Sequence, residues 1–192
     1  MTYEPSKSPI LKLWKTLGGN GFGHWLVSKI VCFNAPYFSS IKPRFTQIKP
    51  GLVEVTLKKR RAVQNHIKTV HAIAMCNAAE LAGGVCLDVS LNGNFRWIPV
   101  GMTVQYQKMA KTDLRAVCKV DDFHWDTAQD VVMPVSVFDT NARRSSTQTS
   151  PCGFHPRKNK LCRMVMTRFR VLSDSEYGRL PGSPPNSSRS GQ

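Results

Sequence analysis

Residues 65–84 read NHIKTVHAIAMCNAAELAGG, and this stretch decides the fold. Its many alanines and glycines predict a long helix, from about residue 70 to residue 91, that is thin enough for a sheet to approach closely. The helix carries one histidine, His71, near its start, and a carboxylate, Glu80, among apolar neighbours. A carboxylate withdrawn from water is costly unless it is paired or hydrogen-bonded, so Glu80 is a candidate for proton transfer. The alternative is a charge on the one wet face of a buried helix.

Strand patterns occur on both sides of this helix. Val53, Val55 and Leu57 alternate with polar residues, and the turn dipeptide Pro50-Gly51 precedes them. Strands are predicted at residues 41–49, 52–57, 97–107, 114–120 and 131–138. The last three have the order of an antiparallel meander. The pattern predicts an α+β fold in which a curved antiparallel sheet wraps one long central helix.

Two short helices are predicted before the first strand, at residues 9–17 and 24–33. The second has Trp25, Leu26, Ile30 and Phe33 as its apolar set. We expect that set to pack against the domain, and the alternative is a helix that lies on a lipid surface.

The domain plan follows the composition. Residues 1–34 are predicted to form a helical segment that packs on a domain at 35–142, followed by a basic tail at 143–192. The tail is rich in Ser and Pro and changes character near Asn141, as a diverged or frame-shifted end would. One more strand is possible at 163–171, and the end from residue 178 is expected to be disordered.

The net charge of +15 is unevenly distributed. Residues 1–142 hold 17 Lys/Arg and 10 Asp/Glu (net +7), and residues 143–192 hold 10 and 2 (net +8). Because half of the excess lies in the tail, and no recognition helix or aromatic-basic pattern occurs, we expect no specific nucleic-acid binding. No run of about 18 apolar residues indicates a transmembrane segment, and no secretory signal is visible, so a cytoplasmic location is expected.

The six cysteines form no Cys-x-x-Cys pair. In a chain without an export signal we expect no disulfide framework. Cys152, His155 and Cys162 match no zinc spacing, so no metal site is expected.

Four segments carry a resemblance to a known family. They are FNAPYFSSIKPRF at 33–45, the turn at 49–51, the block at 65–84 and VGMTVQYQKMAKTDLRA at 100–116. Over about residues 9–140 the chain resembles hotdog-fold acyl-CoA thioesterases, in the largely uncharacterised branch related to the phenylacetate-pathway enzymes. The resemblance implies hydrolysis of an acyl-CoA without a cofactor other than the coenzyme A of the substrate. The alternative is a catalytically inactive hotdog protein that binds acyl-CoA or a protein partner.

The resemblance also implies residue roles. Asn65 would position water, His71 and the backbone N–H of Ala72 would polarise the thioester carbonyl, and Glu80 would act as base or nucleophile. Family members have glycine where this chain has Ala72, and the next residue, Ile73, adds bulk.

The spacing of His71 and Glu80 has a geometric consequence. Nine residues of helix span about 13–14 Å and place the two side chains on opposite faces. Only a second subunit could bring a glutamate beside this histidine, so a homodimer or dimer of dimers with composite sites is predicted. Asn77 would orient Glu80, and His66 would cap or pack near Asn65.

Four residues are candidates for contacts with the substrate. Lys58, Arg60 and Lys108 could contact the phosphates of coenzyme A, although such charges are more often solvated. Tyr106 lies on a strand expected near the acyl group, and its alternative role is ordinary core packing.

Overall fold

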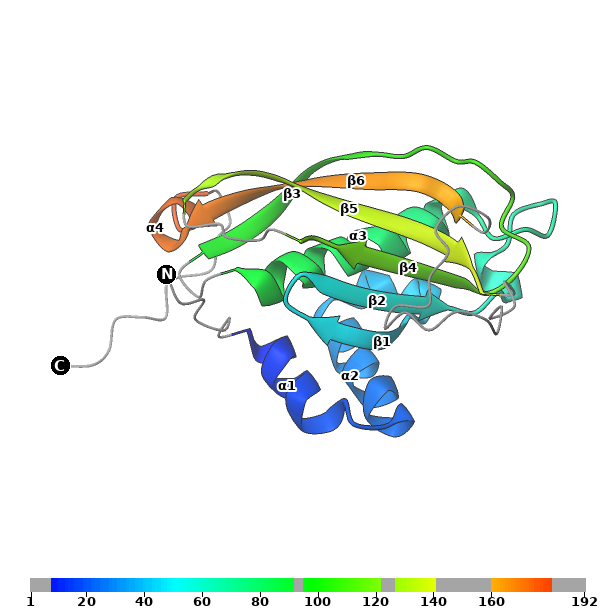
Figure 1. Cartoon of the computed structure of the whole chain (residues 1–192), viewed down its shortest axis with the longest axis horizontal. Helices are drawn as coiled ribbons and strands as arrows, with labels where there is room; N and C mark the ends of the chain where they lie inside the picture. The colour runs from blue at the N-terminus through cyan, green and yellow to red at the C-terminus, as the bar shows by residue number, and fades with distance from the viewer. Residues whose placement is uncertain (1–7, 92–94, 122–126, 141–159, 181–192) are drawn as a thin grey trace.

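The computed structural model describes residues 8–91, 95–121, 127–140 and 160–180. Figure 1 shows the long helix α3 (Ala72–Ser90) enclosed by a curved antiparallel sheet. Within the described residues the sheet has six strands in the order β1-β2-β4-β5-β6-β3. The strands are β1 (Arg44–Lys49), β2 (Leu52–Leu57), β3 (Phe95–Thr103), β4 (Leu114–Lys119), β5 (Gln129–Asp139) and β6 (Lys160–Ser173). The α+β architecture predicted from the sequence is confirmed.

Shorter helical elements surround this core. They are α1 (Pro9–Leu17), α2 (Gly21–Asn34), the 3-10 turns η1 (Pro36–Ile41) and η2 (Arg61–Val63), and α4 (Asp174–Tyr177).

Small side chains allow the sheet to close around α3. Gly83 and Gly84 are both buried, but their surroundings differ. A Cβ added at Gly84 would lie 2.8 Å from Cη2 of Trp97 on β3, whereas one at Gly83 would meet its nearest side chains at 3.5 Å. Trp97 packs edge-on against Phe169 of β6, with ring centroids 4.9 Å apart. Gly84 therefore permits the contact between α3 and the β3 side of the sheet.

We expect Gly84→Ala to be less stable than Gly83→Ala. Both changes gain about 1 kcal/mol of helix propensity, so that contribution cancels in the comparison. The difference is the overpacking against Trp97, which costs about 1–3 kcal/mol. Urea unfolding measures it, and equal free energies of unfolding would show that Trp97 moves aside without cost.

The β1–β2 turn also fixes the end of α3. Gly51 has a φ of 72°, a conformation that other L-residues rarely adopt. Its N–H donates to Ser90 Oγ at 2.9 Å, and that hydroxyl donates to the carbonyl of Cys86 at 2.6 Å. The turn dipeptide visible in the sequence therefore connects the first hairpin to the last turn of the central helix.

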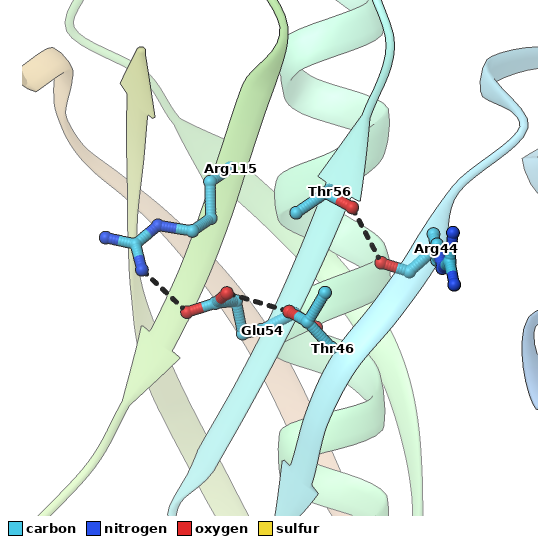
Figure 2. A network of polar contacts seen from close by, with 5 residues as sticks. All are labelled: Arg44, Thr46, Glu54, Thr56 and Arg115. Carbon is cyan, nitrogen blue, oxygen red and sulfur yellow. Dashed lines mark hydrogen bonds and ion pairs between the residues drawn. The ribbon is translucent and has the colours of Figure 1, made fainter. Parts of the chain in front are cut away.

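The two faces of the sheet differ in polarity. On β2 the buried Val53, Val55 and Leu57 alternate with half-buried residues, with the period that the sequence predicts. Figure 2 shows the polar face of β1, β2 and β4. There Glu54 accepts hydrogen bonds from Thr46 Oγ1 at 2.7 Å and from Arg115 Nη1 at 3.0 Å. The apolar face is therefore left for α3.

The strands after α3 do not form the predicted meander. β3 lies at the edge of the sheet beside β6, while β4 pairs with β2 and β5. β6 lies between β5 and β3, so the sheet extends past residue 142, where the sequence placed the end of the domain. Alternation identifies strands but does not specify which edges pair.

The N-terminal helices form a hairpin beside β1, and Figure 1 shows it projecting from the sheet. Asn20 caps α2 by accepting a hydrogen bond from the Gly23 N–H at 2.9 Å. The prediction that the face with Trp25 and Phe33 packs on the domain is wrong. Val27 and Val31 are buried, whereas Trp25 and Phe33 are exposed. Because α2 is apolar on nearly all sides, its periodicity could not identify the buried face.

By length and composition, α3 could cross a membrane. However, 72% of that span is buried inside the domain, as in the core helix of a globular protein. Residues 181–192 of the predicted disordered end lie outside the described residues, as do Cys152, His155 and the side chain of Cys162.

Candidate active site

The first turn of α3 leaves one backbone donor available. His71 is the N-cap, and its Nδ1 accepts a hydrogen bond from the Ile73 N–H at 3.1 Å. The N–H groups of Ala74 and Met75 donate to the carbonyl of His71. Within the described residues, the Ala72 N–H is thus the amide of this turn without an acceptor. Because Nδ1 accepts, the neutral imidazole carries its proton on Nε2.

A pocket of about 180 Å³ lies beside this helix start. Its polar lining residues are Ser40, Gln64, His71 and Asn77, and its apolar lining includes Tyr37 and Ile73. This volume is smaller than the range of about 300–1,000 Å³ that pockets for small ligands usually enclose.

Asn77 forms one wall of the pocket and does not orient Glu80 as predicted. It is only 5% exposed, and its Nδ2 donates to Ser40 Oγ at 3.1 Å. Its Oδ1 has no partner in the part of the chain that the structure describes. The side-chain amide of Asn77 points towards η1 and not along the helix towards Glu80. The helical spacing of the two residues could not show this.

Arg60, a candidate for contact with the coenzyme A phosphates, is half-buried beside the pocket. Its Nη2 donates to the carbonyl of Ser40, and its Nε is buried. The guanidinium therefore holds η1 against the loop after β2, next to the pocket.

Asn65 organises the loop before α3. Its Oδ1 accepts hydrogen bonds from the N–H groups of Ile67 at 3.2 Å and Thr69 at 3.0 Å, and its Nδ2 donates to Thr69 Oγ1 at 2.8 Å. These contacts are those of an Asx turn, and they leave one Nδ2 hydrogen available. His66 lies exposed in the same loop.

Glu80 is half-buried on α3 and does not line the pocket. It shares a helix face with Ile73 and Cys76, at the spacing of neighbouring turns. No hydrogen bond or ion pair of its carboxylate is found among the described residues. The structure therefore does not bring Glu80 and His71 together within one chain.

Tyr106 lies at the surface and does not pack in the core. It is 48% exposed, and its Oη lies 3.0 Å from Cys76 Sγ and 3.4 Å from the carbonyl oxygen of Ala72. Lys58 and Lys108 are exposed. Sequence reasoning missed Cys76, Ser40 and Gln64, because no motif marks them and two of them come from irregular segments.

Among the described residues, no group of three or more His, Cys, Asp or Glu side chains is close enough to hold a metal ion. Cys86 and Cys118 are fully buried. A hydrogen bond with Cys86, together with burial, raises the pKa of the Cys118 thiol well above its usual value, so that thiol is poorly reactive.

Comparisons with known proteins identify the family. The model of a family described as "Domain of unknown function (DUF4442)" matches residues 23–150. The structural-genomics protein APC5556 is 34% identical, with a TM-score of 0.68 over 85% of this chain and 97% of that chain. A search of curated proteins finds no match.

More distant structures share the fold. A thioesterase from Haemophilus influenzae is 10% identical with a TM-score of 0.58, covering 74% of this chain and 86% of that chain. A thioesterase-family protein from Silicibacter pomeroyi is 13% identical with a TM-score of 0.58, covering 76% and 96%. The chain belongs to the DUF4442 family and has a hotdog fold, which it shares with these thioesterase structures.

Proposed function

We propose that the protein is an acyl-CoA thioesterase that hydrolyses its substrate to a free acid and coenzyme A in a site shared by two copies of the chain. The observation that carries the proposal is the Ala72 N–H, which has no acceptor in the described structure and lies at the start of α3 beside a pocket.

The start of α3 can stabilise the charge that develops on the thioester oxygen. The Ala72 N–H points out of the helix start, where the helix dipole is positive. Donors placed where an oxyanion forms lower the barrier of acyl transfer. Alanine in place of the glycine of family members keeps this N–H, and the proton on Nε2 of a neutral His71 is a second candidate donor.

Glu80 is the proposed base. A carboxylate near the bound carbonyl would take a proton from water as the water oxygen bonds to the thioester carbon. The tetrahedral intermediate then loses the coenzyme A thiolate, which receives the proton from Glu80. This sequence needs no cofactor beyond the coenzyme A of the substrate.

The glutamate must come from a second copy, because about 13–14 Å of helix separates Glu80 from His71 in one chain. β3 supports such an assembly. It is an edge strand without a fully buried residue, and its Trp97 covers Gly84 on α3. A second copy that pairs along β3 would also cover an edge that is otherwise open to aggregation.

A distant relative offers further support. Two structures of a Staphylococcus aureus thioesterase carry alanine in place of a glutamine and of a glutamate that lie fifteen positions apart. Asn65 and Glu80 are also fifteen positions apart in this chain. Asn65 would act through the loop that it organises, and Lys58 and Lys108 are the exposed candidates for contacts with the coenzyme A phosphates.

Thiol release from short, long and aromatic acyl-CoAs tests the proposal. A blank without substrate is needed, because the reagent also reports the six cysteines of the protein. Turnover on any member of the panel supports a thioesterase. Tight acyl-CoA binding without turnover would support the inactive binding protein instead, a role that the exposed Ile73 at the pocket favours.

A further inference from the structure

The exposed face of α2 has an unusual composition. Phe22 and Phe33 are 70% and 86% exposed, and Trp25 is 47% exposed. Together with Lys29 they define the α2 stripe, since positions 22, 25, 29 and 33 fall within about 80° of one another on a helix. The opposite side of α2 buries Val27 and Val31 against the domain. The stripe is therefore a second apolar face that the described residues do not cover.

We propose that the α2 stripe docks this protein on the headgroup region of an anionic phospholipid bilayer. Large aromatic side chains beside lysines are typical of helices that lie in a membrane interface. Lys29 Nζ lies 5.9 Å from the centre of the Trp25 ring, and the rings of Phe22 and Trp25 are 5.6 Å apart. The rings would enter the interface while Lys29 reaches lipid phosphates.

The positive charge of the segment around the stripe favours binding to an anionic surface over a neutral one. Residues 8–49, which contain α1, α2, η1 and β1, include six Lys or Arg and no Asp or Glu, and the acidic residues that contact them are Asp88 at Ser8 and Glu54 at Thr46. Each lysine or arginine near an anionic leaflet adds attraction, and an acidic side chain would oppose it. An apolar stripe inside a purely basic segment is complementary to a layer of acidic lipid headgroups.

The position of the stripe leaves it accessible. Figure 1 shows α1 and α2 projecting as a hairpin from the β1 side of the sheet. β1 and β3 are the two ends of the strand order, so a second copy paired along β3 would lie at the other edge. Phe22 is the second residue of α2 and lies at the tip of the hairpin.

The stripe also leads towards the pocket. Tyr37, which lies in η1 four residues after Phe33, is 70% exposed and lines the pocket beside His71. If the proposed function holds, a docked enzyme would present its pocket near the surface into which acyl chains partition. The docking itself does not depend on catalysis.

Vesicle binding of the full chain tests the docking, without acyl-CoA. Sedimentation with vesicles of phosphatidylcholine alone, or with phosphatidylglycerol added, gives the partition coefficient. We expect binding to the anionic vesicles that falls about tenfold or more in Phe22→Ser/Phe33→Ser. Val132→Ser removes an exposed apolar side chain of β5 and is expected to leave binding unchanged. Lys29→Glu is expected to weaken binding to the anionic vesicles.

Brominated lipids locate the contact. The chain has four tryptophans, so quenching is compared between the parent and Trp25→Phe. We expect vesicle-dependent quenching that Trp25→Phe largely removes. Equal binding of the parent and Phe22→Ser/Phe33→Ser would show attraction by the basic tail alone and overturn the proposal. A change of oligomeric state in that double variant would also overturn it, since a second copy would then cover the stripe.

Discussion

Glu80→Gln is expected to lower kcat for acyl-CoA hydrolysis by about 10²–10⁴-fold. Glutamine keeps the size and hydrogen-bonding capacity of glutamate but cannot take a proton from water. Glu80 is half-buried and has no partner among the described residues, so its replacement breaks no contact that the structure shows. The free energy of unfolding should therefore stay close to that of the parent.

Glu54→Gln is the matched control for this change. Glu54 is another partly exposed glutamate, but its carboxylate bonds Thr46 and Arg115 on the outer face of the sheet. We expect a modest loss of stability and an unchanged kcat for Glu54→Gln. Equal activity of Glu80→Gln and the parent would reject Glu80 as the base.

Ala72→Pro is expected to lower kcat by about 10²–10³-fold, the usual effect of losing one oxyanion donor. Proline removes the one N–H of the first turn of α3 that has no acceptor among the described residues. The helix should tolerate it, because Ala72 is the first helical residue, where proline is favoured. His71 has φ −64° and ψ 140°, the extended conformation that a residue before proline prefers.

Ala72→Ser distinguishes the effect of losing the backbone N–H from the effect of changing the side chain. Serine keeps the N–H and adds a small polar group, so we expect most of the activity to be retained. Thermal melts of the two variants check that both are folded. If Ala72→Pro were folded and fully active, the oxyanion would have to be stabilised elsewhere.

Much of the fold could be predicted from local pattern. The small residues of 65–84 identified the central helix, and Pro50-Gly51 identified the first turn. Both are local requirements: one concerns side-chain volume, and the other a φ value that favours glycine. The position of β3 beside β6 depends on long-range pairing, which alternation does not encode.

The site was predictable only in part. The helix start at His71 and Ala72 followed from the resemblance, and the structure adds why one amide is available there. The contacts of Asn77 and Arg60 with Ser40 could not be foreseen, because they depend on how η1 folds back against α3. The face of α2 that carries Trp25 and Phe33 was expected to pack on the domain, because both faces of this helix are apolar and its pattern could not show which one is buried.

The central claim is that each site takes its helix start from one chain and its glutamate from another. Co-expression of Ala72→Pro and Glu80→Gln chains with different tags, followed by purification on both tags, yields a mixed dimer. One of its two sites then has an intact Ala72 amide and an intact Glu80, so we predict about half of the parent kcat although each variant alone is nearly inactive. A mixed dimer as inactive as the two variants would show that both residues act within one chain and would contradict the composite site.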